Sequence, residues 1–352
     1  MPDLEIHIVS CTQQAMESPT KLSDNTWFHL LHVPKIGWLR TGYQGCIRAA
    51  RKKLREIRPD VVHGQGTERE CGLTAAFSGF PNVITIHGNV TQVARAFHAP
   101  FGSFWWCTAL LERLTLPRAG GVLCNSSYTE SLVRPLARRT WRMPNAVRRE
   151  FFETPLPIGS TARKPILLNI GSVIPFKRQL ELLDLAADLH RAGHLFEFHF
   201  IGTANPKDAY ARAFLDRMRA LQDAGFARHI EMIKVSELIQ AFDAASALVH
   251  LPSEEAFGLV VAEALSRNLK LFAGKVGGIS DIADGVEGAE LFQLDDPAAL
   301  QRAIEEWLRA DCPRPKSAAL EMRSRYHPAI IAEKHREVYQ EVISERSLSP
   351  VC

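Results

Sequence analysis

The chain has 352 residues, of which 46% are hydrophobic and 23% are charged. This length exceeds what one ordinary core needs and predicts two domains of roughly 150–180 residues each. The composition is that of a globular protein and excludes a disordered or fibrous chain. No apolar run approaches the ~20 residues that cross a bilayer, and the first residues resemble no signal peptide.

Charge is distributed unevenly along the chain. Residues 1–155 hold 19 Lys and Arg against 12 Asp and Glu, a net charge of +7, and the remainder holds 23 against 27, a net charge of −4. A basic first half fits a phosphate-bearing substrate, an anionic membrane face or an ordinary solvated surface. Nucleic acid is not expected as a partner, because no interleaved basic and aromatic motif occurs.

Cysteine usage bears on the compartment. The seven cysteines are scattered and never form a CxxC pair. This pattern fits free or buried thiols in a reducing compartment and argues against a disulfide framework or a zinc site. We therefore expect a cytoplasmic protein. Peripheral contact with the inner face of the membrane stays open as an alternative.

The first half of the chain alternates short apolar runs with longer amphipathic ones. The short runs predict buried strands over residues 4–11, 28–34, 60–66, 82–88 and 120–127. Residues 45–60 and 103–120 have the spacing of amphipathic helices. Such alternation predicts a parallel sheet whose ligands bind at the carboxyl ends of the strands. The aromatic run at 101–114 is expected to pack on this sheet, with docking on a membrane or a lipid acceptor as the alternative.

A segment rich in proline, residues 153–165, predicts a linker. After it the alternation restarts, with strands expected over residues 166–173, 196–203, 229–235, 247–253 and 269–275 and helices between them. The amphipathic segment 328–347 predicts a closing helix. The fold class is therefore α/β, with two Rossmann-like domains whose parallel sheets face each other across a cleft. The expected divisions are a first domain over residues 1–155, a second over 156–322 and a closing helical segment over 323–352.

The segment HLPSEEAFGLVVAEALS, residues 250–266, carries the strongest functional signal. Gly258 permits a ligand to approach the backbone closely, and the apolar residues after it predict a buried helix. The N–H groups of residues 257–260 would bind a phosphate at the start of this helix. Glu263 lies roughly 7.5 Å farther along the axis, where it would accept hydrogen bonds from the ribose of the same nucleotide. Glu255 would face the sugar on the other side, unless both acids are merely solvated.

The pattern E-x-F-G-L-x-x-x-E of residues 255–263 resembles that of retaining glycosyltransferases of family 4, also called group 1, which have the GT-B fold. Further matches follow in family order over most of the chain: RPDVVHGQG, NVITIHGN, VLCNSSYTESL, MPNAV and IGSVIPFKRQLELL. The resemblance implies transfer of a hexose from a nucleotide-diphospho-sugar to an acceptor hydroxyl, with retention of the anomeric configuration. It also implies a closing helix that packs back on the first domain.

The same resemblance assigns roles to individual residues. Glu255 would bind hydroxyls of the sugar, His87 would orient that sugar, and Lys177 would stabilise the charge that builds on the departing diphosphate. The residues expected to bind the donor are Ser172, Lys177, Arg178, Gly202, Phe257, Gly258, Leu259 and Glu263. No metal or cofactor is expected, because the nucleotide sugar is a co-substrate and no DxD motif stands in a suitable position. The acceptor is open, with a glycan or a lipid-linked glycan as the candidates.

Several positions depart from the family pattern. Ser172 stands where the family usually has a phosphate-binding arginine, and Arg178 is the neighbouring cation that could compensate. Ala146 and Arg148 replace Gly and Asp, and the segment 230–238 is short, so the nucleobase pocket is poorly defined. Two alternative functions therefore stay open: an impaired nucleotide-sugar-binding or scaffold protein, and a sugar-nucleotide epimerase, which would not be expected to carry this acid pair.

The largest departure lies at the beginning of the first domain. The chain opens on what aligns as the second strand of the family, so that the first strand, its glycine-rich loop and the first helix have no counterpart. The strands on either side of the missing one are then expected to have unpaired edges. A start assigned too late or a truncation is favoured over a compact natural variant, and the first domain is expected to fold less well than the second.

Overall fold

The computed structural model describes residues 4–157 and 164–348, and the chain forms two compact units. Unit 1 contains the residues up to Met143 and those from Glu333 onward, and unit 2 is Pro144–Ala332. The sequence placed the first division after residue 155. The structure divides the chain earlier because helix α6 (Glu150–Glu153) buries its two phenylalanines in the core of unit 2. Part of the expected linker, residues 158–163, lies outside the described residues.

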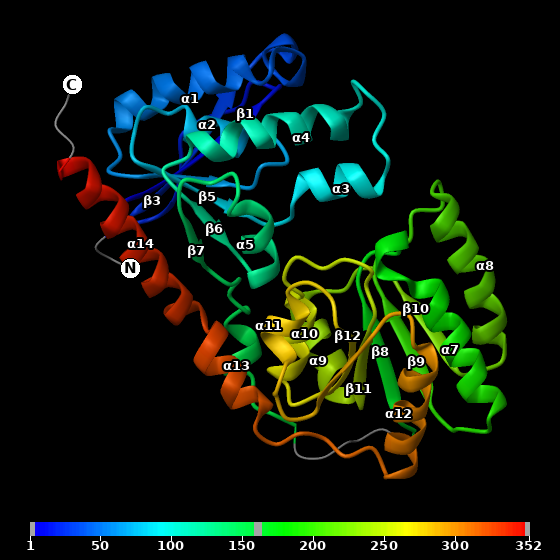
Figure 1. Ribbon diagram of the computed structural model, residues 1–352. Helices are drawn as coiled ribbons and strands as arrows, with labels where there is room; N and C mark the ends of the chain where they lie inside the picture. The colour runs from blue at the N-terminus through cyan, green and yellow to red at the C-terminus, as the bar shows by residue number, and fades with distance from the viewer. Residues whose placement is uncertain (1–3, 158–163, 349–352) are drawn as a thin grey trace. The chain divides into compact units, whose positions relative to one another are not determined.

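Unit 2 is built on a parallel sheet of six strands with helices on both faces (Figure 1). In sheet order the strands are β10 (Ala227–Ile230), β9 (Glu197–Ile201), β8 (Ile166–Ile170), β11 (Ala247–His250), β12 (Lys270–Gly274) and β13 (Ala289–Phe292). The sequence predicted β8, β9, β11 and β12, placed β10 too late at 229–235, and left β13 unassigned. The strand order reverses between β8 and β11, so that the loops leaving these two strands diverge and leave room for a ligand.

The helices of unit 2 bury two apolar clusters, one on each face of the sheet. On one face lie α6, α9 (Val235–Ala244), α10 (Leu259–Leu265), α11 (Ile279–Ala283) and α13 (Ala318–Tyr326), and on the other lie α7 (Gln179–Arg191), α8 (Ala209–Asp223) and α12 (Pro297–Arg309). Strand β11 shows the division: Leu248 joins the first cluster, while Ala247 and Val249 join the second. Burial on both faces explains why these strands read as unbroken apolar runs.

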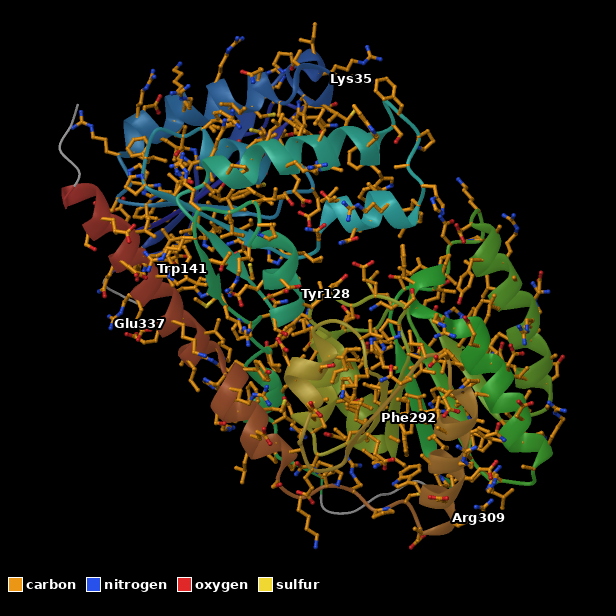
Figure 2. The ribbon with its side chains drawn as sticks, viewed as in Figure 1. Lys35, Tyr128, Trp141, Phe292, Arg309 and Glu337 are labelled. Carbon is orange, nitrogen blue, oxygen red and sulfur yellow. The ribbon has the colours of Figure 1, made fainter. Side chains whose placement is uncertain are left out.

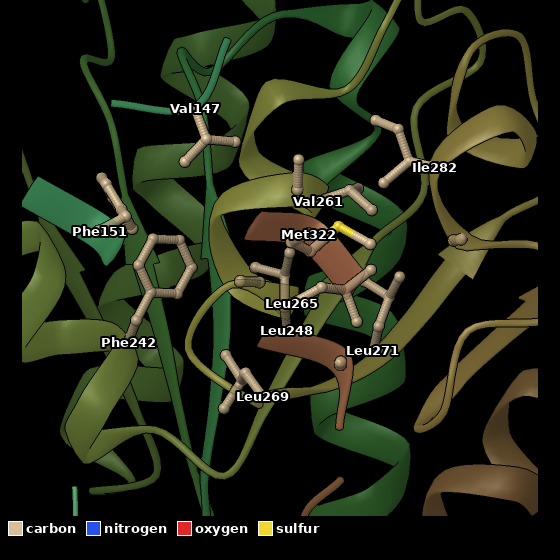
Figure 3. Close-up of a cluster of buried hydrophobic side chains, with 14 of the residues drawn as sticks. Val147, Phe151, Phe242, Leu248, Val261, Leu265, Leu269, Leu271, Ile282 and Met322 are labelled. Carbon is tan, nitrogen blue, oxygen red and sulfur yellow. The ribbon is translucent and has the colours of Figure 1, made fainter. Parts of the chain in front are cut away.

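The first of these clusters surrounds helix α10, which carries five buried residues (Figure 3). The rings of Phe151 and Phe242 meet edge to face, with their centroids 5.8 Å apart. Met322 of α13 belongs to the same cluster, as do Val261 and Leu265 of α10. Helix α10 is therefore held from several sides, which fixes the position of the loop that leads into it.

Arg267, which follows α10, is the largest charged side chain in this interior and is 1% exposed. Its guanidinium pairs with both carboxylate oxygens of Asp243, at 2.8 and 2.9 Å. Its remaining N–H groups donate to the main-chain carbonyls of Phe151, Thr154 and Pro155, at 2.6–3.1 Å. One buried cation thus ties the segment that enters unit 2 to helix α9 and to the end of α10.

Unit 1 contains two sheets. A parallel sheet has the order β4 (Val62–Gln65), β5 (Asn82–Ile86), β6 (Val122–Cys124) and β7 (Thr140–Arg142), and a mixed sheet has the order β1 (Ile6–Thr12), β3 (Thr26–His32) and β2 (Thr20–Ser23). The helices of this unit are α1 (Gln44–Ile57), α2 (Glu70–Ala76), α3 (Val90–Ala96), α4 (Phe104–Thr115), α5 (Ser127–Val133) and most of α14 (Pro328–Leu348). The sequence did not predict β2 and β7, which are short and lack a buried side chain.

The expected unpaired edges are confirmed within the described part of unit 1. Strand β1 pairs with β3 alone and β4 pairs with β5 alone, so each stands at the end of its own sheet. Ile6 and Ile8 of β1 are 41% and 43% exposed, which is unusual for β-branched residues of a strand. The division of this unit into two sheets therefore leaves apolar strand surface in contact with solvent.

Within unit 1, helix α14 packs along strand β7. Trp141 of β7 donates its indole N–H to Glu341 of α14 at 2.9 Å, and Figure 2 labels this indole. Arg139 lies 4.5 Å from the ring centroid of Trp141 and forms ion pairs with Glu341 and Glu345. The end of the chain is thereby fixed to the edge strand of the parallel sheet.

Replacement of Arg267 by alanine is expected to destabilise the protein by about 3–5 kcal/mol, because the half-buried carboxylate of Asp243 and three main-chain carbonyls would lose their donor and the interior would lose a fully buried side chain. The measurement is urea-induced unfolding monitored by tryptophan fluorescence. Arg219→Ala is the matched control: this side chain is 73% exposed, so a change within about 0.5 kcal/mol is expected. Equal effects of the two substitutions would contradict the role given to Arg267.

Candidate functional site

Two loops at the switch point of the sheet in unit 2 bring Lys177 and Glu255 together. Lys177 ends a single 3-10 turn, Pro175–Lys177, after β8, and Glu255 lies in the loop between β11 and α10. The ammonium nitrogen of Lys177 is 2.5 Å from one carboxylate oxygen of Glu255. The ring nitrogen Nε2 of His250, the last residue of β11, is 3.3 Å from the same oxygen. Two residues 78 positions apart in sequence are therefore a direct ion pair.

The surroundings of Glu255 keep it ionised. Burial by itself would raise the pKa of this carboxyl, but the hydrogen bond with His250 and the charge of Lys177 outweigh burial and lower the pKa to about 2. Burial lowers the pKa of His250, which is 1% exposed. The neutral ring therefore donates its Nε2–H to the carboxylate. The site thus presents a fixed negative charge with an adjacent positive charge.

The loop ends at Gly258, whose backbone is left-handed with φ 94°. A side chain at this position would be strained and would meet Ile279 at 3.2 Å. Phe257 is 3% exposed and anchors the loop in the core, and Leu259 begins α10. No side chain caps the start of this helix, so its first N–H groups have no side-chain acceptor.

Glu263 lies on α10 in a different environment from Glu255. It is 4% exposed, and its nearest cation is Arg148, 3.4 Å from the carboxylate. Burial raises the pKa of Glu263 to about 7, against the opposing effect of Arg148. The structure therefore joins Glu255 to Lys177 but places Glu263 in a separate pair. The sequence did not predict this partner, because Arg148 was noted only as a departure from the family pattern.

The remaining donor-binding candidates of unit 2 follow the carboxyl ends of the neighbouring strands β8 and β9. Gly202 follows β9, and a Cβ there would lie 2.0 Å from the carbonyl oxygen of Gly171, so only glycine fits. Ser172 accepts a hydrogen bond from Thr203 at 3.4 Å. Arg178 donates to Glu181 at 3.0 Å and lines a pocket of about 410 Å³ between α7 and α12. Its guanidinium is therefore held by the first turn of α7.

His87, the candidate from unit 1, follows β5 and is exposed. Its Nε2 is 3.1 Å from the amide oxygen of Gln65. The amide nitrogen of Gln65 is 3.3 Å from the ring of His63. The ring nitrogens of His63 also contact the hydroxyls of Tyr339 and Thr85, each at 2.6 Å. A chain of hydrogen bonds thus runs from helix α14 to His87.

The sequence did not predict Gln65 and Tyr339 as members of this group. A signal for Gln65 was available, because residues 63 and 65 point to the same face of β4. Burial lowers the pKa of His63 to about 3, so this ring is neutral and acts only through hydrogen bonds. Within residues 4–157 and 164–348, no three His, Cys, Asp or Glu side chains are grouped to hold a metal ion.

Comparison with known proteins identifies the class. Sucrose-phosphate synthase from Thermosynechococcus elongatus is similar with a TM-score of 0.78 at 17% identity, over 98% of this chain and 90% of that one. HepE from Anabaena, solved in complex with UDP and glucose, is similar with a TM-score of 0.68 at 13% identity, over 96% and 99% of the two chains. The protein therefore has the GT-B fold, as the sequence predicted.

Family models match both units. Residues 153–326 match the model described as glycosyl transferases group 1, and residues 3–151 match that of glycosyltransferase family 4. The chain belongs to the group 1 glycosyltransferases, which confirms the resemblance noted in the sequence. In the part of the chain that the structure describes, no helix has the combined length and apolar content needed to span a bilayer.

Two curated relatives share about half of the chain. A D-inositol 3-phosphate glycosyltransferase from Corynebacterium diphtheriae is 28% identical over 188 residues, which are 52% of this chain and 44% of that protein. A sucrose synthase from Acidithiobacillus caldus is 30% identical over 189 residues, which are 50% of this chain and 23% of that protein. The chain thus matches less than half the length of each of these relatives.

The raised pKa of Glu263 predicts a pH-dependent stability. The folded protein binds the proton of Glu263 more tightly than the unfolded chain does. The stabilising contribution of this protonated side chain is therefore complete below pH 4.5 and is lost as the pH rises through about 7. Glu263→Gln removes the titration, so the variant should gain on the wild type across this window, by about 3 kcal/mol at most. The measurement is thermal unfolding of both proteins over this pH range. Glu306→Gln, at an exposed residue of α12, is the control and should follow the wild type.

Proposed function

We propose that this glycosyltransferase moves a hexose from a nucleotide-diphospho-sugar to an acceptor hydroxyl and retains the anomeric configuration. The observation that carries the proposal is the half-buried Lys177–Glu255 pair at the switch point of the sheet, where a ligand can meet both charges. HepE from Anabaena, which is similar in fold, has also been solved in complex with UDP-glucose, and this supports a donor of the same chemical class. The two curated relatives are named for different reactions, so they do not indicate one sugar or one acceptor for this protein.

The proposed division of labour follows from charge. When the bond between sugar and diphosphate breaks, negative charge builds on the diphosphate, and Lys177 would stabilise it together with the main-chain N–H groups at Gly258 and Leu259. Glu255, held ionised by its neighbours, would accept hydrogen bonds from hydroxyls of the sugar. Glu263 would bind the ribose of the nucleotide, and binding there at neutral pH would favour its ionised form.

The donor would change the pairing within the site. The ammonium of Lys177 is directed at Glu255, and the side chain of Lys177 is 21% exposed. A diphosphate offers this ammonium a second anion, so Lys177 would bridge the diphosphate and Glu255. The hydrogen bond from His250 would keep Glu255 in place during that exchange. Acceptor attack from the face of the departing diphosphate needs no nucleophilic side chain.

One observation favours the alternative of a nucleotide-sugar-binding protein without turnover. Ser172 provides a hydroxyl where the family usually has a cation, and Arg178 is engaged by Glu181. Such a protein would bind a nucleoside diphosphate and transfer no sugar to any acceptor. The two functions separate in one experiment, in which donor binding is measured by calorimetry and nucleoside diphosphate release is measured with a panel of glycan and lipid-linked acceptors.

Glu255→Gln is expected to lower sugar transfer by about 10²-fold or more, because the variant loses the charge that Lys177 and the sugar hydroxyls meet. Transfer is measured as nucleoside diphosphate released from UDP- and GDP-sugars in the presence of acceptor. Glu254→Gln changes the neighbouring acid in the same loop and should retain transfer. Unchanged activity of Glu255→Gln in a folded protein would remove this residue from the scheme.

Gln65→Leu is expected to lower kcat about tenfold with little change in KM, because the ring of His87 loses the acceptor that orients it. Gln65→Glu keeps an acceptor oxygen at this position, now as a carboxylate, and should retain most of the wild-type rate. The measurement is steady-state kinetics on the donor found active in the assay above. If both variants lose equal activity, the loss reflects local structure and the positioning role of Gln65 is wrong.

A further inference from the structure

Helices α3 and α4 of unit 1 form a hairpin (Figure 1). Its connection and the first turn of α4 together carry five aromatic residues. We call this set the aromatic tip; its members are Phe97, Phe101, Phe104, Trp105 and Trp106. Phe101 is 87% exposed, Phe97 is 49% exposed and Phe104 is 44% exposed. The sequence favoured packing of residues 101–114 on the sheet, which is wrong for Phe101 and Phe104.

The aromatic rings contact one another. The ring of Phe101 lies over Trp106 with centroids 4.5 Å apart, and Phe97 stacks on Trp105 at 6.0 Å. The buried residues of α4 are instead Thr108, Glu112 and Thr115. Mutual stacking keeps the rings ordered at the surface, where large apolar side chains gathered in one patch mark an interaction site.

The charge around the aromatic tip has one sign. Between Glu70 and Glu112 the sequence has no aspartate or glutamate, a stretch that includes the whole of α3 and the connection. Glu112 is 1% exposed and contributes no acid to the surface. Arg95, in the last turn of α3 and close to Phe97 in sequence, is exposed. The charged residue nearest to the aromatic tip along this segment is therefore a cation.

The base of the hairpin is fixed by Glu112. Its carboxylate accepts the main-chain N–H groups of Val90 and Thr91 at 3.1 and 3.0 Å, at the start of α3. It also accepts the hydroxyls of Thr91 and Thr67, at 2.7 and 2.6 Å. A single buried carboxylate on α4 thus ties α3 to α4 and holds the hairpin as a unit, so the aromatic tip is presented in a set orientation.

We propose that the aromatic tip docks the protein on an anionic lipid bilayer. Tryptophan and phenylalanine rings are favoured at the level of the lipid headgroups, and the exposed Arg95 beside them would attract anionic lipid. A lipid surface accounts for the aromatic residues, the positive flank and the absence of acids together. Docking of this kind does not depend on the reaction proposed above, and it brings the protein to the surface where a lipid-linked acceptor would be found.

The test uses the full chain and vesicles of phosphatidylcholine, with and without phosphatidylglycerol. The wild type is expected to sediment with the anionic vesicles and to bind neutral vesicles more weakly. Phe101→Ser should weaken binding to anionic vesicles about tenfold, and Arg95→Glu should weaken it about fivefold. Leu320→Ser and Arg302→Glu, at exposed residues of unit 2, are the matched controls and should bind as the wild type does.

A second readout locates the contact on the molecule. Vesicles that contain brominated lipid should quench the fluorescence of Trp105 and Trp106, and the double variant Trp105→Phe/Trp106→Phe should lose this quenching. Trp141→Phe should retain it. The proposal is overturned if the wild type binds no vesicles, or if Phe101→Ser and its control bind equally. It is also overturned if Phe101→Ser only dissociates a dimer of the wild type in ultracentrifugation, because the occupant would then be a second copy of the chain.

Discussion

The site in unit 2 depends on one electrostatic constraint: the charge of Glu255 is stable in a largely buried loop only because Lys177 and His250 face it. Without them, burial would favour the protonated acid, which carries no negative charge to pair with the ammonium of Lys177. The pair also explains the local structure. The 3-10 turn after β8 positions Lys177, and the loop that ends at Gly258 positions Glu255. The ion pair therefore joins these two loops.

Glu255 and Glu263, on either side of Gly258 in sequence, are the same kind of side chain but differ in pKa because their surroundings differ. Glu255 faces a cation and a ring N–H and has a pKa of about 2, whereas Glu263 is buried among apolar residues of α10 with one arginine near it and has a pKa of about 7. One acid is therefore a permanent anion and the other titrates near neutral pH. A ligand with hydroxyl groups near both acids would meet an ionised carboxylate at Glu255 and, at Glu263, a carboxyl whose protonation changes near neutral pH.

The sequence predicted the parts of this site that are local and missed those that are distant. Glu255, Gly258 and the helix after them occupy one short segment, where spacing and glycine chemistry are informative. The partners His250 and Arg148 were not predicted, because the first looked like part of an apolar strand and the second lies 115 positions from Glu263. The same limit applies to the fold: the buried strands of unit 2 were clear from composition, whereas exposed β2 and β7 have no apolar pattern to detect.

In unit 1 the same reasoning links features that the sequence treated separately. Glu112 binds Thr67, in the loop after β4, and the start of α3, in the loop after β5. Gln65 and His87 belong to the ends of those same two strands. The hydrogen bonds of one carboxylate therefore join the base of the α3–α4 hairpin to the strand ends that hold His87. The base of the hairpin and these strand ends thus share one buried carboxylate with several hydrogen bonds.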